Sequence, residues 1–198
     1  MSLTIIEHKS ASYAPRTYHN AHTGDLTIAI ALDFNTAGEK LTKKAALNKG
    51  ALNYLSIDIQ APPIESARSL YVACKRPEKL AEPYQVKTLN VAGNGIYTLI
   101  KAGYSQEQIN RIVYDIISPV HQHHQFNHIV SGGQTGIDMA GAVVGIELGI
   151  PVTLTFPKGY KMRTIDNKDS ESNESEIRFM VNNFVEKLHL DLYFELID

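Results

Sequence analysis

The chain has 198 residues, a length typical of one domain with a full hydrophobic core. Its 43% hydrophobic and 20% charged residues are ordinary for a globular protein, and its formal charge of −2 excludes a bulk electrostatic attraction to nucleic acid or to an anionic membrane. The single cysteine, Cys74, excludes an internal disulfide framework and a cysteine-rich metal site.

The N-terminal segment lacks the long apolar core of a signal peptide, and no run in the chain approaches the ~18 apolar residues that span a bilayer. We therefore expect a cytoplasmic protein without a membrane partner. We expect residues 1–25 to form a loosely ordered extension of a single domain that spans 1–198.

Strand-like runs follow along the chain, at 26–32, 52–59, 86–92, 126–131 and 151–156. Several of them are apolar almost throughout, which is typical of strands covered on both faces of a parallel sheet. Helical patterns lie between most of these runs. The alternation predicts a three-layer α/β fold with a mostly parallel sheet.

The helical patterns have recognisable ends. Ser105 and Gln108 form a capping box ahead of an apolar helix face, and we expect Pro119 to end that helix. Residues 137–148 are apolar almost all round, which predicts a buried helix. The polar, turn-rich segment 161–174 predicts a loose loop that could fold over a neighbouring site.

In a parallel α/β sheet, ligands collect at the edge where strands end and helices begin. Polar or glycine-containing loops follow four of the predicted strands, and we expect these loops to converge on one cleft at that edge. The candidate ligand-binding residues in the loops are Thr36, Gly38, Asn94, Gly95, Ser131, Gly132, Gly133, Gln134, Thr135, Gly136, Lys158, Gly159 and Arg163.

The loop SGGQTGID at 131–138 joins a strand-like run to the predicted buried helix. Its glycines let a backbone approach a phosphate closely, and a helix N-terminus presents free N–H groups and a partial positive charge. The pattern is not G-x-G-x-x-G and lacks the lysine of a P-loop. Asp138 also suits the first turn of a helix, where a carboxylate is favourable without any ligand.

The other loops have structural explanations beside the functional one. Residues 33–46 are typical of a solvated loop that leads into a surface helix, and Asn94 with Gly95 forms a common turn pair. The three positive charges between 158 and 163 are either solvated surface charges or partners for phosphate oxygens. Both alternatives stay open for each loop.

The stretches SGGQTGID, ELGIP and PKG, between 131 and 159, resemble the circularly permuted, molybdenum-carrier-like branch of the SLOG superfamily, which is related to the LOG and DprA proteins. With DFNTAGEKLT and LNVAGNGIYTL, the chain also resembles a group of bacterial and phage proteins. The resemblance implies a Rossmann-like fold and a glycine loop that binds a nucleotide or a nucleotide-derived ligand. It makes Gly132–Gly136 and Asp138 candidate contacts, with Lys158 and Gly159 facing them.

One departure from the family concerns catalysis. LOG phosphoribohydrolases carry a P-G-G-x-G-T-x-x-E motif with a catalytic glutamate. This chain has Thr135 and Gly136 in the reverse order, and Met139 to Gly141 stand where that glutamate would be sought. We therefore expect a module that binds or senses a nucleotide-like phosphorylated ligand.

Two other functions stay open. One is a nucleotide phosphoribohydrolase in which Glu39 or Asp138 acts as the catalytic acid/base or stabilises an oxocarbenium ion. The other is a carrier of molybdate or molybdopterin, since a glycine cradle does not distinguish small oxyanions well. The histidines in HQHHQFNH at 121–128 lack a nearby acidic ligand, so we expect no metal and no cofactor. A homo-oligomer is left open.

Overall fold

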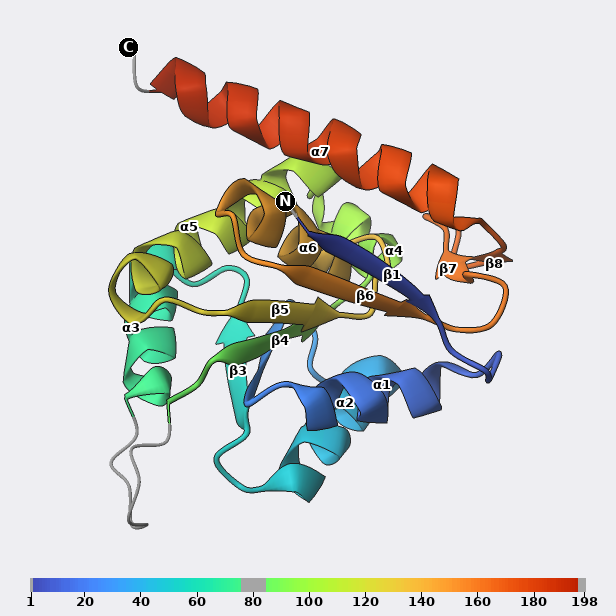
Figure 1. Ribbon diagram of the computed structural model, residues 1–198, viewed down its shortest axis with the longest axis horizontal. Coiled ribbons are helices and arrows are strands. Elements are labelled where there is room, and N and C mark those ends of the chain that lie inside the picture. The colour runs from blue at the N-terminus through green and yellow to red at the C-terminus, as the bar shows by residue number, and fades with distance from the viewer. Residues whose placement is uncertain (1, 76–84, 196–198) are drawn as a thin grey trace.

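Six parallel strands form the central sheet of the computed structural model, which describes residues 2–75 and 85–195 (Figure 1). In spatial order they are β1 (Leu3–Glu7), β6 (Val152–Phe156), β5 (His128–Ser131), β4 (Thr88–Gly93), β2 (Leu26–Ala31) and β3 (Tyr54–Asp58). Each neighbouring pair is hydrogen-bonded in parallel. The predicted parallel sheet is confirmed.

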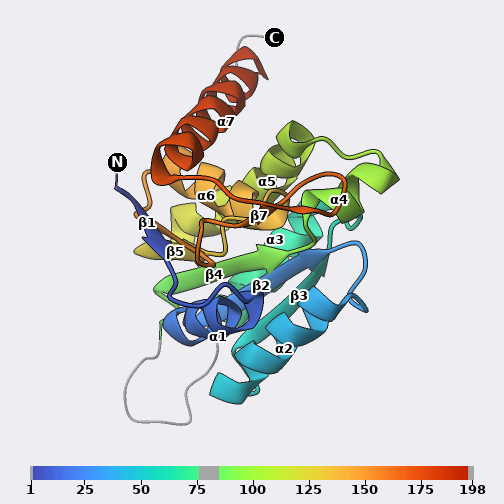
Figure 2. The same cartoon turned by 90° about the vertical axis from the view of Figure 1, so that its right-hand side faces the viewer.

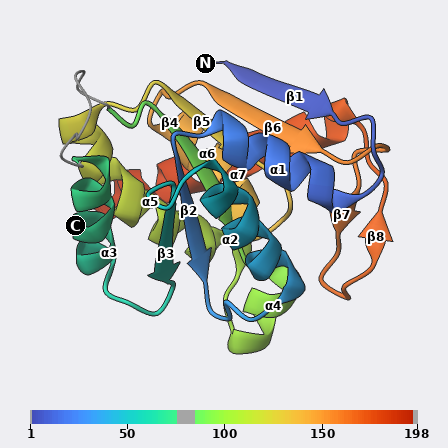
Figure 3. The same ribbon diagram turned by 90° about the horizontal axis from the view of Figure 1, so that it is seen from below.

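Helices cover both faces of this sheet (Figures 2 and 3). One face carries α1 (Tyr13–Thr23) and α2 (Ala37–Lys49). The other carries α3 (Pro63–Cys74), α5 (Gln106–His124), α6 (Ile137–Glu147) and α7 (Glu174–Glu195), and two short turns, α4 (Ile96–Leu99) and η1 (Ile100–Ala102), lead from β4 into α5. The predicted three-layer, Rossmann-like α/β sandwich is confirmed.

The centre of the core is α6, whose residues from Ile137 to Ile146 are all buried. Two glycines let this helix approach the sheet. A Cβ atom on Gly141 would lie 2.6 Å from Cβ of Val91 on β4, and one on Gly145 would lie 2.5 Å from Cγ2 of Val152 on β6. Helix α7 packs across α6 and α5 on the side away from the sheet (Figure 1).

The connections create a crevice between β2 and β4. From β2 the chain crosses through α2 to β3 on one side, and it then returns through α3 to β4 on the other side of β2. Ligands of open α/β sheets bind at such a switch in strand order, outside the carboxyl ends of the strands. Asn94 ties these ends together, since its Oδ1 accepts hydrogen bonds from the backbone N–H groups of Leu32 (2.9 Å) and Asp33 (3.0 Å).

The expectation that residues 1–25 are loosely ordered is wrong. Residues Leu3–Glu7 form the edge strand β1, which pairs with β6, and Tyr13–Thr23 form α1. The physical reason is that α1 buries polar side chains, Arg16 and Asn20, beside a single small apolar one, Ala21. A helix whose inner face is polar is not detected by a search for an apolar stripe.

Two other boundaries differ from expectation. Pro119 lies inside α5, which continues to His124, because the burial of Val120 in the core and the packing of α5 against α3 and α6 offset the backbone hydrogen bond that proline cannot donate. The segment 161–174 forms a small antiparallel hairpin of β7 (Met162–Arg163) and β8 (Asp169–Ser170). The capping box of Ser105 and Gln108 is confirmed. No helix in the described part of the chain has both the length and the apolar character needed to cross a membrane.

Candidate functional site

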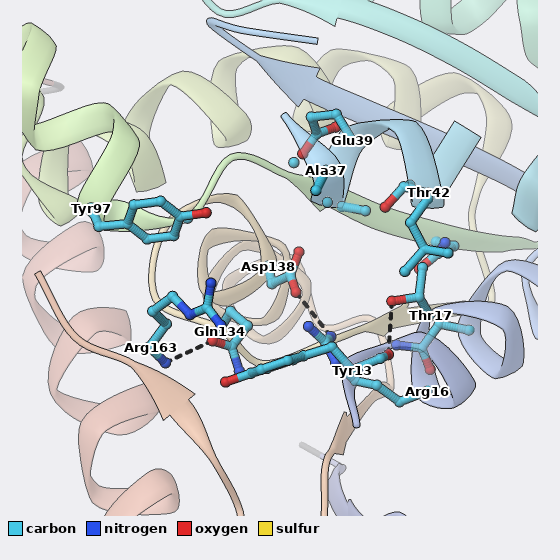
Figure 4. Close-up of a pocket in the computed structure, with 18 residues that line it drawn as sticks. Tyr13, Arg16, Thr17, Ala37, Glu39, Thr42, Tyr97, Gln134, Asp138 and Arg163 are labelled. Atoms are coloured by element: carbon cyan, nitrogen blue, oxygen red, sulfur yellow. Dashed lines mark hydrogen bonds and ion pairs between the residues drawn. The ribbon is translucent and has the colours of Figure 1, made fainter. Parts of the chain in front are cut away.

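A cleft of about 320 Å³ lies at the carboxyl edge of the sheet and extends under α1 (Figure 4). Its walls come from α1, the first turns of α2, the end of β4, the loop before α6 and the strand β7. Of the residues predicted from the sequence, those that line it are Gly38, Glu39, Gly95, Gly132, Gln134, Asp138 and Arg163. The cleft coincides with the crevice between β2 and β4.

A buried ion pair lies at the centre of the cleft. Nη1 of Arg16 is 3.1 Å from Oδ2 of Asp138, and both side chains are 9% exposed. Burial raises the pKa of Asp138, and the Arg16 guanidinium opposes this shift. A Cβ atom on Gly132 would overlap the guanidinium. This glycine therefore leaves room for Arg16, which fills the space over the loop.

Glu39 adds a second buried carboxyl group. It lies in the first turn of α2, where the Thr36 hydroxyl caps the helix by accepting the Glu39 N–H at 3.2 Å. Burial, together with the nearby carboxylates of Asp138 and Asp33, raises the pKa of Glu39 to about 8, and a hydrogen bond with Asn94 opposes the shift. At neutral pH the cleft therefore holds a largely protonated acid beside an ion pair.

Three side chains in the cleft have a buried polar atom without a partner. They are Nε of Arg16, Oδ1 of Asn20 and Oε2 of Glu39, which have no hydrogen-bond partner within residues 2–75 and 85–195. These residues are 7%, 4% and 3% exposed. An unsatisfied buried polar group costs about 1–3 kcal/mol, so such atoms call for a ligand or a water molecule.

Arg163 closes the opposite side of the cleft. Its guanidinium lies 5.2 Å from the ring centre of Tyr13 and 5.9 Å from that of Tyr97. Its Nε is 3.3 Å from Oδ1 of Asp169, an ion pair in which both side chains are partly exposed. The Tyr13 hydroxyl donates to the same Oδ1 at 2.8 Å, and burial together with this contact raises the Tyr13 pKa to about 12.

Other groups of the protein already accept hydrogen bonds from several N–H groups of the glycine loop and the start of α6. The N–H of Gly136 donates to Oε1 of Gln106 at 2.6 Å, and that of Ile137 donates to the Asn94 carbonyl at 3.2 Å. The N–H of Met139 donates to the Gln134 carbonyl at 2.9 Å. Asp138 supplies a negative charge in the first turn of α6, where a carboxylate is favourable. The protein's own carboxylate thus occupies a position that an anionic ligand would favour.

Other predicted ligand contacts have structural roles outside the cleft lining. Thr36 caps α2, and Asn94 joins β2 to β4. The Ser131 hydroxyl is buried and donates to the Val91 carbonyl at 2.7 Å, while the Thr135 hydroxyl donates to the Arg163 carbonyl at 3.2 Å. These residues shape the site rather than line it.

The remaining predicted residues are packed or exposed. A Cβ atom on Gly133 would overlap the Phe156 ring, and one on Gly136 would lie 2.5 Å from the Asn94 carbonyl oxygen. Lys158 is exposed, and its backbone N–H donates to the Ser10 carbonyl at 2.9 Å. The N–H of Gly159 donates to Oε1 of Glu7 at 2.7 Å. The loop after β6 therefore reaches the cleft through Arg163 and not through Lys158.

The sequence interpretation missed the contribution of α1. Tyr13, Arg16, Thr17 and Asn20 all line the cleft, and they recur at the spacing of one helix face. That polar and aromatic stripe was a usable signal. Tyr97, which follows the predicted Asn94-Gly95 turn, was also missed.

The histidines near the end of α5 have structural partners. His124 Nε2 lies 2.6 Å from the Val86 carbonyl, His121 Nδ1 accepts from the Phe126 N–H at 3.1 Å, and His128 Nε2 lies 2.9 Å from the Thr153 hydroxyl. Within residues 2–75 and 85–195, no group of three or more histidine, cysteine or acidic side chains is arranged to hold a metal ion.

Comparison with known proteins gives no relative from which a function could be transferred. No family model matches the sequence, and neither a curated protein nor a solved structure matches it. The SLOG resemblance therefore rests on the motifs alone, and the chemistry of the cleft has to be inferred from its own geometry.

Proposed function

We propose that the cleft binds a nucleotide-like phosphorylated ligand. The observation that carries the proposal is that buried polar atoms of Arg16, Asn20 and Glu39 line one cleft without a hydrogen-bond partner among the described residues. A protein that keeps such atoms together offers a ready hydrogen-bonding site to a ligand with matching groups.

The position and shape of the cleft support a nucleotide rather than a bare oxyanion. Parallel α/β sheets bind nucleotides at the switch in strand order, and this cleft lies at that switch. Its volume of about 320 Å³ falls in the range of small-molecule sites and is far larger than phosphate or molybdate needs. Neutral hydrogen-bonding groups and the cation of Arg163 both face it.

A thermal-shift experiment tests the proposal. The probes are the four ribonucleoside 5′-monophosphates, inorganic phosphate and molybdate. A ligand at a hundred times its dissociation constant stabilises a fold by about 2.7 kcal/mol, so a nucleotide that binds gives a clear rise in Tm. We expect at least one nucleotide to do so, and phosphate and molybdate at the same concentration to give smaller shifts.

Two variants show whether the shift comes from this cleft. Asn20→Leu replaces a buried acceptor with an apolar side chain of similar size, so the fold should be kept and the nucleotide shift lost. Lys158→Gln removes a positive charge outside the cleft and should leave the shift unchanged. The proposal fails if no nucleotide raises Tm, or if Asn20→Leu responds as the wild type does.

Hydrolysis of a nucleotide N-glycosidic bond is the second candidate. What favours it is the presence of two carboxyl groups, Glu39 and Asp138, in one buried cleft. Their environments differ, since Arg16 contacts Asp138 while the pKa of Glu39 is raised to about 8. A protonated acid beside an ionised carboxylate is the arrangement that glycoside hydrolysis uses.

Product analysis tests this second candidate. In the reaction, Glu39 would donate its proton to the departing base while Asp138 stabilises the developing positive charge on the sugar, and water would add to C1′. Incubation with nucleoside monophosphates would then release free base and ribose 5-phosphate. Release that disappears in both Glu39→Gln and Asp138→Asn would establish an enzyme, and tight binding without release would leave a binding module.

A further inference from the structure

This inference rests on the proposed function and concerns how the ligand lies in the cleft. We infer that the uncharged part of a nucleotide, its sugar and base, is held between α1 and α2 by Arg16, Asn20 and Glu39, and that its phosphate faces Arg163. The resemblance to the SLOG superfamily implies instead that the glycine loop before α6 faces the phosphate. Figure 4 shows Arg163 and Tyr97 on one side of the cleft, Arg16 and Thr42 on the other, and Asp138 between them.

The hydrogen-bonding groups between α1 and α2 suit a ligand that both donates and accepts. Nε of Arg16 needs an acceptor, Oδ1 of Asn20 needs a donor, and the Glu39 carboxyl group can serve as either. A phosphate dianion has no donor and would leave the Asn20 oxygen unsatisfied. Sugar hydroxyl groups and nucleobase amide groups have donors and acceptors side by side.

The charges at this end also disfavour a phosphate. The guanidinium of Arg16 is already neutralised by Asp138 at 3.1 Å, and both side chains are 9% exposed. Glu39 brings a second carboxyl group next to that pair. A phosphate at this position would meet a compensated cation and two carboxyl groups, and burial of an uncompensated charge is costly.

The start of α6 offers a phosphate little stabilisation to offset these unfavourable charges. The N–H groups of Gly136, Ile137 and Met139 donate to other groups of the protein, as described above. The side chain of Arg16 fills the space in front of Gly132. A phosphate would therefore have to displace both the guanidinium and existing hydrogen bonds to reach this helix end.

The opposite side of the cleft has an accessible cation. The Arg163 side chain is 36% exposed, and its Asp169 partner is 43% exposed. Exposed ion pairs contribute little to stability, so a phosphate can replace Asp169 as the partner of the guanidinium at small cost and form charge-assisted hydrogen bonds with it. The rings of Tyr13 and Tyr97 limit the positions that the guanidinium can adopt.

Calorimetric titration of matched ligands tests this orientation. The probes are the four ribonucleoside 5′-monophosphates, the corresponding nucleosides and inorganic phosphate. Hydrogen bonds to charged groups are stronger than those between neutral groups, so Arg163→Gln should weaken binding of the nucleotide by about tenfold or more. The same substitution should change the affinity for the nucleoside by less than about threefold, which corresponds to under 0.7 kcal/mol.

Two further variants complete the design. Asn20→Leu should weaken binding of the nucleotide and of its nucleoside by the same factor, because the lost acceptor contacts the part that the two ligands share. Lys158→Gln is the matched control, since it removes a charge from the same loop at a position that does not line the cleft, and both affinities should stay as in the wild type.

The outcomes separate this inference from the function on which it depends. If a nucleotide binds but Arg163→Gln weakens nucleoside and nucleotide equally, the orientation is wrong and nucleotide binding stands. The orientation is also wrong if inorganic phosphate displaces a bound nucleoside from the wild-type protein, because a phosphate that faces Arg163 leaves the nucleoside position free. If neither nucleotides nor nucleosides bind the wild type, the proposed function itself is overturned.

Discussion

Glu39 and Asp138 show how environment gives one residue type two behaviours within a single cleft. Both carboxyl groups are buried, which raises both pKa values. Asp138 contacts the guanidinium of Arg16, whereas the groups that shift the pKa of Glu39 are two carboxylates and one amide. Asp138 therefore ionises first, and its charge in turn helps Glu39 to keep its proton.

The pH dependence of stability should report the protonation of Glu39. Its pKa is about 8 in the folded protein against 4.5 as the ordinary value, so between these pH values the folded state binds more protons than the unfolded state. Stability attributable to Glu39 is fully present below about pH 4.5 and is lost as the pH rises through 8.

The comparison with Glu39→Gln isolates this effect, because glutamine does not titrate. Between pH 5 and pH 9, the free energy of unfolding of the wild type should fall relative to the variant by up to about 4 kcal/mol. Urea unfolding of both proteins at several pH values measures the difference. A difference that stays constant with pH would show that Glu39 is ionised at neutral pH.

The ion pair of Arg16 and Asp138 makes a second prediction at the residue scale. Arg16→Met removes the cation and leaves a buried carboxylate, which should cost about 3–5 kcal/mol at neutral pH. The cost should shrink at lower pH, because Asp138 then takes up a proton. Adding Asp138→Asn to the variant should recover most of the loss, and urea unfolding of the two variants checks both expectations. A loss that neither acid nor the second substitution reduces would contradict the assignment of a charged pair.

At the scale of elements, the sequence predicted those strands and helices that a local apolar pattern marks. The five strands from β2 to β6 and the buried helix α6 were all located, because apolar side chains run through most of these strands and surround α6 almost completely. Strand β1 and helix α1 were missed. The inner face of α1 is polar where it lines the cleft, so a search for apolar stripes does not detect the helix, although its polar and aromatic residues recur at helical spacing.

The glycine loop shows how far the candidate site can be predicted from the sequence. Its location was predicted, but the roles of its residues depend on neighbours that lie far away in the sequence. The Ser131 hydroxyl donates a hydrogen bond to the Val91 carbonyl group, and the Phe156 ring fills the space beside Gly133. Arg163 lines the cleft while Lys158 does not, although both follow the same strand. Only the tertiary structure decides which polar group faces a ligand.

The packing of Gly133 against Phe156 leads to a prediction about stability. It has a φ of +70°, and an added Cβ atom would overlap the Phe156 ring. Gly133→Ala should therefore combine backbone strain of about 1–2 kcal/mol with the cost of overpacking, about 1–3 kcal/mol. Gly149→Ala is the control, because Gly149 has a φ of +74° and its Cβ atom would meet nothing within 4 Å.

The difference between the two alanine variants isolates the contact with Phe156. In chemical denaturation, Gly133→Ala should lose more stability than Gly149→Ala by at least about 1 kcal/mol. Equal losses would mean that the Phe156 ring moves aside without cost. Because substitution at Gly133 acts on folding, a loss of ligand binding in such a variant would not identify a phosphate cradle.

At the scale of the whole molecule, the volume of a cavity does not identify the binding site. A groove of about 590 Å³ between α5 and α7 is larger than the cleft. It is lined by apolar side chains such as Phe184 and Leu188, and Lys187 forms an ion pair with Glu107 at 2.9 Å on its rim. The buried polar atoms that lack partners in the described part of the chain do not line this groove. Unsatisfied polar groups, rather than volume, therefore favour the smaller cleft.

Hydrogen exchange can decide between these two cavities in solution. The cleft is built from segments that are far apart in the sequence, namely α1, the start of α2, the end of β4, the loop before α6 and β7. A bound nucleotide should slow backbone exchange in peptides that cover α1 and the β7–β8 hairpin, because both lie at the rim of the sheet and a ligand would join them to the core.

Peptides from the second half of α7, which lies on the far side of α6 from the sheet, provide the internal control. Their exchange should change little, because α7 contributes no residue to the cleft and local opening of its exposed turns does not depend on the ligand. Exchange measured by mass spectrometry with and without the nucleotide that gives the largest thermal shift checks this pattern. Protection concentrated in α5 and α7 would move the binding site to the larger groove and would overturn the assignment of the cleft.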